Sequence, residues 1–165
     1  MNDQTIVVTG FMGTGKSTTA LELARLLQRP LIDMDTLIEQ RTGWTIPRLF
    51  AERGEPFFRA IEHGLCLELS LRTGLVVATG GGALMNSHSQ EVFEQVCFLV
   101  CLMARPDTIE ARLEGADNRP LVAHWQELLK KRTPIYEGIA YRVWTDDKTP
   151  KQVAEEIVSL WNASQ

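Results

Sequence analysis

The sequence predicts an α/β fold in which helices cover both faces of a parallel sheet. Short apolar segments alternate with longer segments of helical periodicity along the chain, which is typical of strands joined by crossover helices. The chain has 165 residues, 44% of them hydrophobic, which is the size and composition of one domain spanning residues 1–165. In such folds ligands bind outside the carboxyl ends of the strands.

Five short segments rich in Val, Ile, Leu or aromatic residues are bounded by Gly, Pro or Asp and are predicted to be strands. They are Thr5–Thr9, Pro30–Asp33, Leu75–Thr79, Val96–Met103 and Arg142–Thr145. The segments with helical periodicity are Ser17–Gln28, Thr36–Gly54, Phe57–Thr73, Pro106–Leu113, Trp125–Tyr136 and Pro150–Trp161. Residues 114–124 have no clear period, and we expect a loop there that acts as a lid.

Charge and cysteine content exclude several classes of protein. The formal net charge is −4, so the chain has no overall positive field with which to hold nucleic acid or an anionic membrane surface. Cys66, Cys97 and Cys101 form an odd set without C-x-x-C spacing and are predicted to be buried free thiols. The chain has no signal-peptide pattern and no apolar run long enough to span a bilayer, so we expect a cytoplasmic monomer without nucleic-acid or membrane partners.

A glycine-rich motif follows the first predicted strand directly. Residues 10–17, GFMGTGKS, fit the pattern G-x-x-x-x-G-K-[ST] and lead into a predicted helix. Glycines let successive backbone N–H groups surround phosphate oxygens, Lys16 reaches the β and γ phosphates, and Ser17 ligates Mg²⁺. The alternative is a structural turn in which Ser17 is an ordinary N-cap. The predicted ATP-binding residues of this segment are Gly13, Thr14, Gly15, Lys16, Ser17 and Thr18.

Two carboxylates end the second predicted strand. Asp33 and Asp35 are two residues apart, which places them on one face of the sheet edge. Asp33 is suited to hold a water molecule in the shell of Mg²⁺, and Asp35 to accept or orient the hydroxyl of a phosphoryl acceptor. The competing interpretation is that either aspartate is a turn residue or a helix N-cap.

Beyond the phosphate-binding motif the sequence resembles the shikimate kinase family nearly end to end. The residues that carry the resemblance are Ile38-Glu39, Gly43, Ile46, Phe50, Gly54-Glu55, Phe58-Arg59, Glu62, Gly80-Gly81-Gly82, Arg119-Pro120 and Arg132-Thr133-Pro134-Ile135-Tyr136. This resemblance implies a three-layer P-loop fold with a five-stranded parallel sheet in the order 2-3-1-4-5. It further implies transfer of the γ-phosphoryl group of ATP, with Mg²⁺, to the 3-hydroxyl of shikimate in aromatic amino-acid biosynthesis.

The resemblance also implies which residues hold the anionic substrate. Arg59 and Arg132 would clasp its carboxylate, which suits the planar fork of a guanidinium. The alternatives are that Arg59 pairs with Glu62 on a solvated helix face and that Arg132 belongs to a solvated basic run. Phe50 and Phe58 are candidates for an apolar wall, although such aromatics are more often core. The implied substrate-binding residues are Asp35, Arg59, Gly80, Gly81, Gly82 and Arg132 with Phe50 and Phe58, and the substrate-binding helical region is expected at about residues 35–62.

The remaining site residues follow from the same resemblance. Lys16, Asp35 and Arg119 are implied to be catalytic, with Arg119 lying over the phosphates from the lid. Arg112 would lie against the adenine, and Lys148 and Pro150 fall where the family has its adenine-side loop. The lid is shorter than is usual in the family.

Two alternative functions remain open from the sequence. One is a kinase for another small hydroxy acid, such as gluconate, because the same nucleotide site can serve a different acceptor pocket. The other is a module that binds nucleotide without transferring phosphate.

Overall fold

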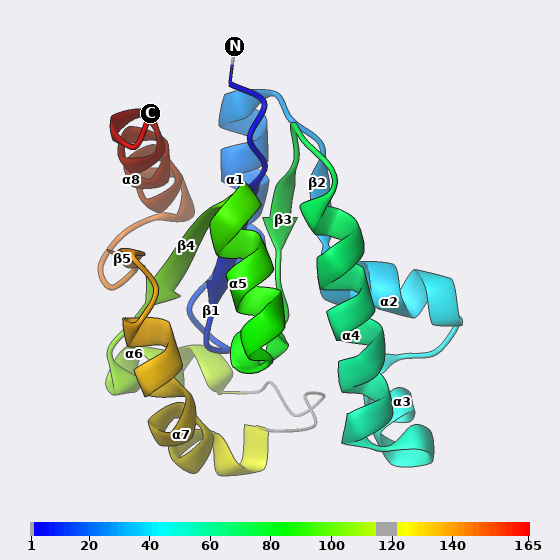
Figure 1. The fold of residues 1–165 in the computed structure, drawn as a ribbon. Coiled ribbons are helices and arrows are strands. Elements are labelled where there is room, and N and C mark those ends of the chain that lie inside the picture. The colour runs from blue at the N-terminus through cyan, green and yellow to red at the C-terminus, as the bar shows by residue number, and fades with distance from the viewer. Residues whose placement is uncertain (1, 115–121) are drawn as a thin grey trace.

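A computed structural model describes residues 2–114 and 122–165 of the chain. It contains a five-stranded sheet with the strand order β2-β3-β1-β4-β5 (Figure 1), and every pair of neighbouring strands is parallel. The strands are β1 (Ile6–Gly10), β2 (Leu31–Asp33), β3 (Val76–Ala78), β4 (Phe98–Met103) and β5 (Tyr141–Trp144). The predicted α/β fold and strand order are confirmed.

Alternate residues of the strands pack into two separate cores, one on each face of the sheet. Ile6 and Val8 of β1 belong to the core shared with α1 (Lys16–Leu27) and α8 (Pro150–Ala163). Val7 points to the opposite core, which is shared with helices that include α4 (Glu55–Ser70), α5 (Ser87–Val96) and α7 (Trp125–Glu137). The period of two along each strand therefore produces three layers of helix, sheet and helix.

The sequence prediction of one helix over Thr36–Gly54 is wrong. The structure has two helices there, α2 (Met34–Thr42) and α3 (Ile46–Arg53). Gly43 ends α2 with a φ of 73°, and the Thr45 side chain begins α3 by accepting from the Arg48 backbone N–H at 3.3 Å. A left-handed glycine followed by a threonine N-cap breaks the helix although the apolar periodicity continues.

A second difference lies between β3 and β4, where sequence reasoning placed no helix. The structure has the short helix η1 (Ala83–Met85) and then α5, which is capped by the Asn86 side chain. Val96 ends α5, so β4 begins at Phe98 and not at Val96 as predicted. This helix of ten residues was not predicted because it contains few apolar residues, too few to show a helical period.

The remaining elements are α6 (Pro106–Leu113) and the short helix η2 (Val122–His124), while the central part of the predicted lid lies outside the described residues. Cys66, Cys97 and Cys101 are buried free thiols, as predicted, and burial raises the pKa of Cys97 to about 11. Among the described residues, every helix is too short or too polar to cross a membrane. Both chain termini lie at the end of the sheet opposite the carboxyl ends of the strands (Figure 1).

Candidate active site

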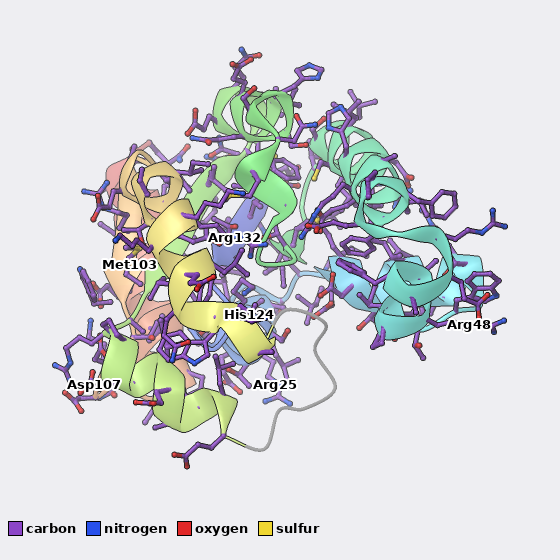
Figure 2. All side chains as sticks on the ribbon, turned by 90° about the horizontal axis from the view of Figure 1, so that it is seen from below. Arg25, Arg48, Met103, Asp107, His124 and Arg132 are labelled. Atoms are coloured by element: carbon purple, nitrogen blue, oxygen red, sulfur yellow. The ribbon has the colours of Figure 1, made fainter. Side chains whose placement is uncertain are left out.

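A cleft of about 760 Å³ lies at the carboxyl ends of β1, β2 and β3. Seen from below, α7 with Arg132 lies on one side of the molecule and α3 with Arg48 on the other (Figure 2). The cleft brings together residues of the glycine-rich loop, the two aspartates, α3, α4, the triple glycine and α7. Its lining consists of Met12, Gly13, Gly15, Lys16, Ser17, Thr18, Asp33, Asp35, Thr36, Glu39, Thr45, Ile46, Pro47, Phe50, Phe58, Arg59, Glu62, Thr79, Gly80, Gly81, Gly82, Arg112 and Arg132.

The glycine-rich loop closes on itself before α1 begins. Gly13 and Gly15 have φ values of 78° and 91°, which residues with a Cβ rarely adopt. Lys16 Nζ and Thr14 Oγ1 both donate to the Phe11 carbonyl, at 2.9 and 2.7 Å. The first backbone N–H groups of an α-helix have no acceptor within the helix, so the start of α1 behind this loop is suited to bind phosphate.

The structure excludes Ser17 as the N-cap of α1, because Gly15 occupies that position. Ser17 Oγ instead donates to Asp33 Oδ2 at 2.8 Å, so the loop and the end of β2 are in direct contact. Asp33 is also the N-cap of α2, since its Oδ1 accepts from the Thr36 backbone N–H at 3.2 Å. Asp33 is therefore a helix N-cap, as the competing interpretation held, and it also lies beside Ser17.

Asp35 is in the first turn of α2 and does not cap it. Its Oδ1 and the Oε2 of Glu62 are the buried side-chain N and O atoms that lack a hydrogen-bond partner within the described part of the chain. Burial raises the pKa of Asp35, and the positive charge of Lys16 offsets this only in part. Burial likewise raises the pKa of Glu62 in spite of its contact with Arg59. Unpaired buried oxygens are costly, so this pair is a place where a ligand can supply the missing partners.

Two arginines from different helices converge near Gly82. Arg59 of α4 donates to Glu62 at 2.7 Å and to Glu55 at 3.3 Å, so the ion pair expected as the alternative does form. Arg132 of α7 is only 4% exposed, which rules out a solvated basic run. A Cβ added to Gly82 would lie 2.6 Å from Arg59 Nη2 and 2.8 Å from Arg132 Nη2. The missing side chain lets both guanidinium groups approach the same backbone.

An aromatic pair lines the cleft beside the acidic residues. The rings of Phe50 and Phe58 are 4.9 Å apart at an interplanar angle of 45°. Phe58 is 3% exposed and belongs to the hydrophobic core, while Phe50 is only partly buried. Phe58 is therefore a core residue with Phe50 packed against the core, and both rings also line the cleft.

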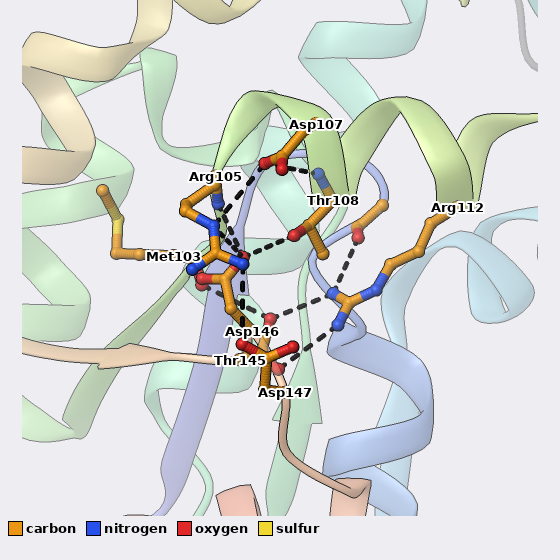
Figure 3. Close-up of polar contacts among 9 residues, drawn as sticks. Met103, Arg105, Asp107, Thr108, Arg112, Thr145, Asp146 and Asp147 are labelled. Carbon is orange, nitrogen blue, oxygen red and sulfur yellow. Dashed lines mark hydrogen bonds and ion pairs between the residues drawn. The ribbon is translucent and has the colours of Figure 1, made fainter.

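The predicted adenine-side residues divide into two groups. Arg112 lines the cleft and donates to the Gly13 carbonyl at 3.1 Å and to Thr145 Oγ1 at 3.0 Å (Figure 3). Lys148 and Pro150 do not line the cleft. Lys148 pairs with Glu156 at 2.7 Å, and Pro150 is the first residue of α8. Arg119 lies outside the described residues.

Sequence reasoning gave no site role to three residues that shape the cleft. Glu62 appeared only as a partner of Arg59, although it is 2% exposed and has an unpaired oxygen. Glu39 accepts from the Ile46 backbone N–H at 2.8 Å and ties α2 to α3. Tyr136 donates its hydroxyl to the Gly81 carbonyl at 2.5 Å. All three belong to segments that carry the family resemblance, but their roles depend on tertiary contacts that the sequence does not show.

Comparison with known proteins adds a family match, two similar relatives and one similar solved structure. A family model described as shikimate kinase matches residues 12–162. A shikimate kinase of Caldanaerobacter subterraneus subsp. tengcongensis is 35% identical over 94% of this chain and 95% of its own length. One from Thermus thermophilus is 39% identical over 97% and 91% of the two chains. The structure of the shikimate kinase from Acinetobacter baumannii in complex with shikimate matches with a TM-score of 0.91 at 34% identity, covering 98% of this chain and 94% of that one.

Proposed function

Since the chain belongs to the shikimate kinase family, we propose that its cleft transfers the γ-phosphoryl group of ATP to the 3-hydroxyl of shikimate. The observation that carries this proposal is the convergence of three groups in one cleft. These are the phosphate-binding loop, the buried carboxylate of Asp35, and the paired guanidinium groups of Arg59 and Arg132. The products are ADP and shikimate 3-phosphate.

The nucleotide end of the cleft suits ATP with Mg²⁺, which shikimate kinases use. Backbone N–H groups of residues 13–18 would hold the phosphates, and Lys16 would balance the negative charge that spreads over the transferred group. Ser17 and Asp33 offer only oxygen atoms, the ligand type that Mg²⁺ prefers. When bound, the ion neutralises charge on the β and γ phosphates. The described residues contain no group of three or more His, Cys, Asp or Glu able to hold a metal, so phosphate and water would complete its shell.

The acceptor end of the cleft suits an anionic ring compound. Arg59 and Arg132 are held by ion pairing and by burial, so their forks are fixed before a carboxylate arrives. Phe50 and Phe58 offer an apolar face for the ring. Two fixed guanidinium groups favour a carboxylate such as shikimate over a neutral sugar.

Asp35 is the proposed acceptor of the proton from the attacking hydroxyl. As the hydroxyl oxygen forms its bond to the γ-phosphorus, the bond to the bridging oxygen of ADP breaks, and the proton passes to the Asp35 carboxylate. The raised pKa of Asp35 makes this carboxylate a stronger base than an exposed aspartate. Its unpaired Oδ1 is the atom that would accept the hydrogen bond.

The proposal extends to residues and properties outside the described cleft. Arg119 would share with Lys16 the charge of the transferred group, as the family resemblance implies. Residues 1–165 would act as one domain, in which about residues 35–62 bind the acceptor and about residues 114–124 form the lid. We place the enzyme in the cytoplasm. We also propose that it is a monomer, which sedimentation at a mass of 18.6 kDa would demonstrate.

A coupled assay of ADP release tests the proposal directly. Shikimate, quinate and gluconate are offered in parallel with ATP and Mg²⁺, and a sample without acceptor gives the background. We expect turnover that depends on shikimate. Turnover with gluconate and none with shikimate would favour the other small-metabolite kinase, and nucleotide binding without turnover on any acceptor would favour a binding module.

A further inference from the structure

Helix α6 is held at both ends by two consecutive residues that follow β5 (Figure 3). At its start, Asp146 Oδ1 accepts from the Arg105 backbone N–H at 3.0 Å and from Thr108 Oγ1 at 2.6 Å. At its other end, Arg112 donates to Thr145 Oγ1 at 3.0 Å and to the Thr145 carbonyl at 3.3 Å. Two adjacent residues thus fix both the position of the helix along its axis and its rotation.

The same helix packs directly on the phosphate-binding loop. A Cβ added to Gly13 would lie 3.4 Å from Leu113 and 3.5 Å from Ile109, which are both buried. Arg112 Nη1 also donates to the Gly13 carbonyl at 3.1 Å. Because α6 touches the loop through apolar packing and a charge-assisted hydrogen bond, a shift of the helix must move the loop or break this contact.

Thr145 is itself fixed from the sheet. The residue is 3% exposed, its backbone N–H donates to the Met103 carbonyl at 2.8 Å, and its hydroxyl donates to the same carbonyl at 3.3 Å. A hydroxyl has one proton to donate, so the bond from Arg112 must use an oxygen lone pair. Arg112 therefore donates to Thr145, which in turn donates to Met103 of β4, and Arg112 also donates to Gly13 of the phosphate-binding loop.

We propose that Thr145 and Asp146 are positioning residues for the nucleotide, acting through α6 and Arg112 on the phosphate-binding loop. This inference rests on the proposed function in taking ATP as the ligand of that loop. The bonds from the terminal nitrogens of Arg112 to Gly13 and Thr145 fix the plane of the guanidinium, whose flat face suits stacking against a nucleobase. Thr145 thereby sets the plane against which the base would stack.

The test compares Thr145→Val, which keeps the shape of the side chain, with Thr145→Ser, which keeps the hydroxyl. ADP binding is measured by titration calorimetry without acceptor, and the KM values for ATP and shikimate are measured in the coupled assay. We expect Thr145→Val to raise the Kd for ADP and the KM for ATP about tenfold, the effect of one lost charge-assisted hydrogen bond. The KM for shikimate should stay unchanged, and Thr145→Ser should bind ADP like the unaltered chain.

Two further variants separate positioning from general loss of structure. Asp146→Ala should weaken ADP binding, whereas Asp147→Asn should not, because Asp147 on the same loop is 86% exposed and makes only a 3.5 Å ion pair with Arg105. In a double-mutant cycle, Thr145→Val should change the Kd for ADP by less than about twofold once Arg112→Ala is present, since its effect passes through Arg112.

Three results would overturn the inference. They are equal ADP affinity in the Thr145→Val and unaltered proteins, equal impairment of the Val and Ser variants, and equal increases in the KM values for ATP and shikimate. Because ADP binding needs no acceptor, a chain that binds ADP but does not phosphorylate shikimate would contradict the proposed function, and the positioning role would still be decided by the ADP data.

Discussion

The unpaired carboxylate oxygens of Asp35 and Glu62 both lie beside Gly80. A Cβ added to Gly80 would lie 2.9 Å from Asp35 Oδ1 and 2.9 Å from Glu62 Oε2. Burial is the main cause of the raised pKa of each carboxyl group, and the negative charge of Asp35 further raises the pKa of Glu62. The cleft thus holds two carboxyl groups beside Gly80, and burial of their unpaired oxygens costs free energy. An incoming hydroxyl can bind there.

Replacing the proposed base should abolish most of the turnover and leave nucleotide binding intact. Asp35→Asn keeps the shape of the side chain and removes the proton acceptor, so we expect kcat to fall about 10²- to 10⁴-fold. ADP affinity, measured by calorimetry, should match that of the unaltered protein. A variant with normal kcat would show that Asp35 is not the base.

The same substitution should make the protein more stable at neutral pH. A carboxyl group whose pKa is raised by folding contributes stability that is complete below the pKa of the unfolded chain and is lost as pH rises through the raised value. Asp35→Asn avoids this loss, so its free energy of unfolding should be higher by about 1 kcal/mol at about pH 8. The difference should shrink as pH falls toward the ordinary aspartate pKa of about 4. Urea unfolding at a series of pH values measures it, and a difference independent of pH would contradict the explanation.

A buried guanidinium fork should be necessary for binding the acceptor. Arg132→Lys keeps the positive charge but loses the bidentate geometry, so we expect the KM for shikimate to rise about 10- to 100-fold with little change in the KM for ATP. Lys131→Ala is the matched control, because this neighbouring lysine is exposed. Equal effects of the two substitutions on the KM for shikimate would exclude a specific role for Arg132.

A side chain at Gly82 should impair use of shikimate because it would displace Arg59 and Arg132, and not because it would strain the backbone. Gly82 has a φ of −98°, which alanine adopts without strain. Gly82→Ala would place a methyl group against Arg59 and Arg132, and we expect kcat/KM for shikimate to fall roughly 100-fold.

Gly64→Ala is the control for this substitution. Nothing lies within 4 Å of a Cβ added to Gly64, which is exposed in the middle of α4. This variant should keep full activity and gain about 0.5–1 kcal/mol of stability, because alanine favours the helix. Loss of acceptor binding in both variants would mean that the cleft is sensitive to any change in α4 or η1.

The fold was predictable from the sequence because parallel strands are buried on both faces. Each strand therefore appears in the sequence as a continuous run of apolar residues. The errors arose where local capping overrode periodicity. Gly43 and Thr45 divide an apparently continuous helix, and Asn86 begins α5 in a segment with few apolar residues. Such breaks depend on backbone conformation at single positions, which hydrophobic patterning does not report.

The position of the cleft was predictable where one motif brings several residues together, as in residues 10–17 or the pair Asp33 and Asp35. The site was less predictable where the role of a residue depends on distant partners. The sequence suggested Arg112 only as a neighbour of adenine, whereas the structure joins it to Gly13 and Thr145. The burial of Glu62 and the proximity of Arg59 to Arg132 likewise require α4 and α7 to be placed in space.

The position of the phosphoryl group on the product tests the central claim most directly. The chain is incubated with ATP, Mg²⁺ and shikimate, and the product is analysed by ³¹P and ¹H nuclear magnetic resonance. We predict a single phosphate ester whose phosphorus couples to the proton on carbon 3, formed in equal amount to ADP. Release of ADP without phosphorylated shikimate, or an ester on another oxygen, would contradict the account.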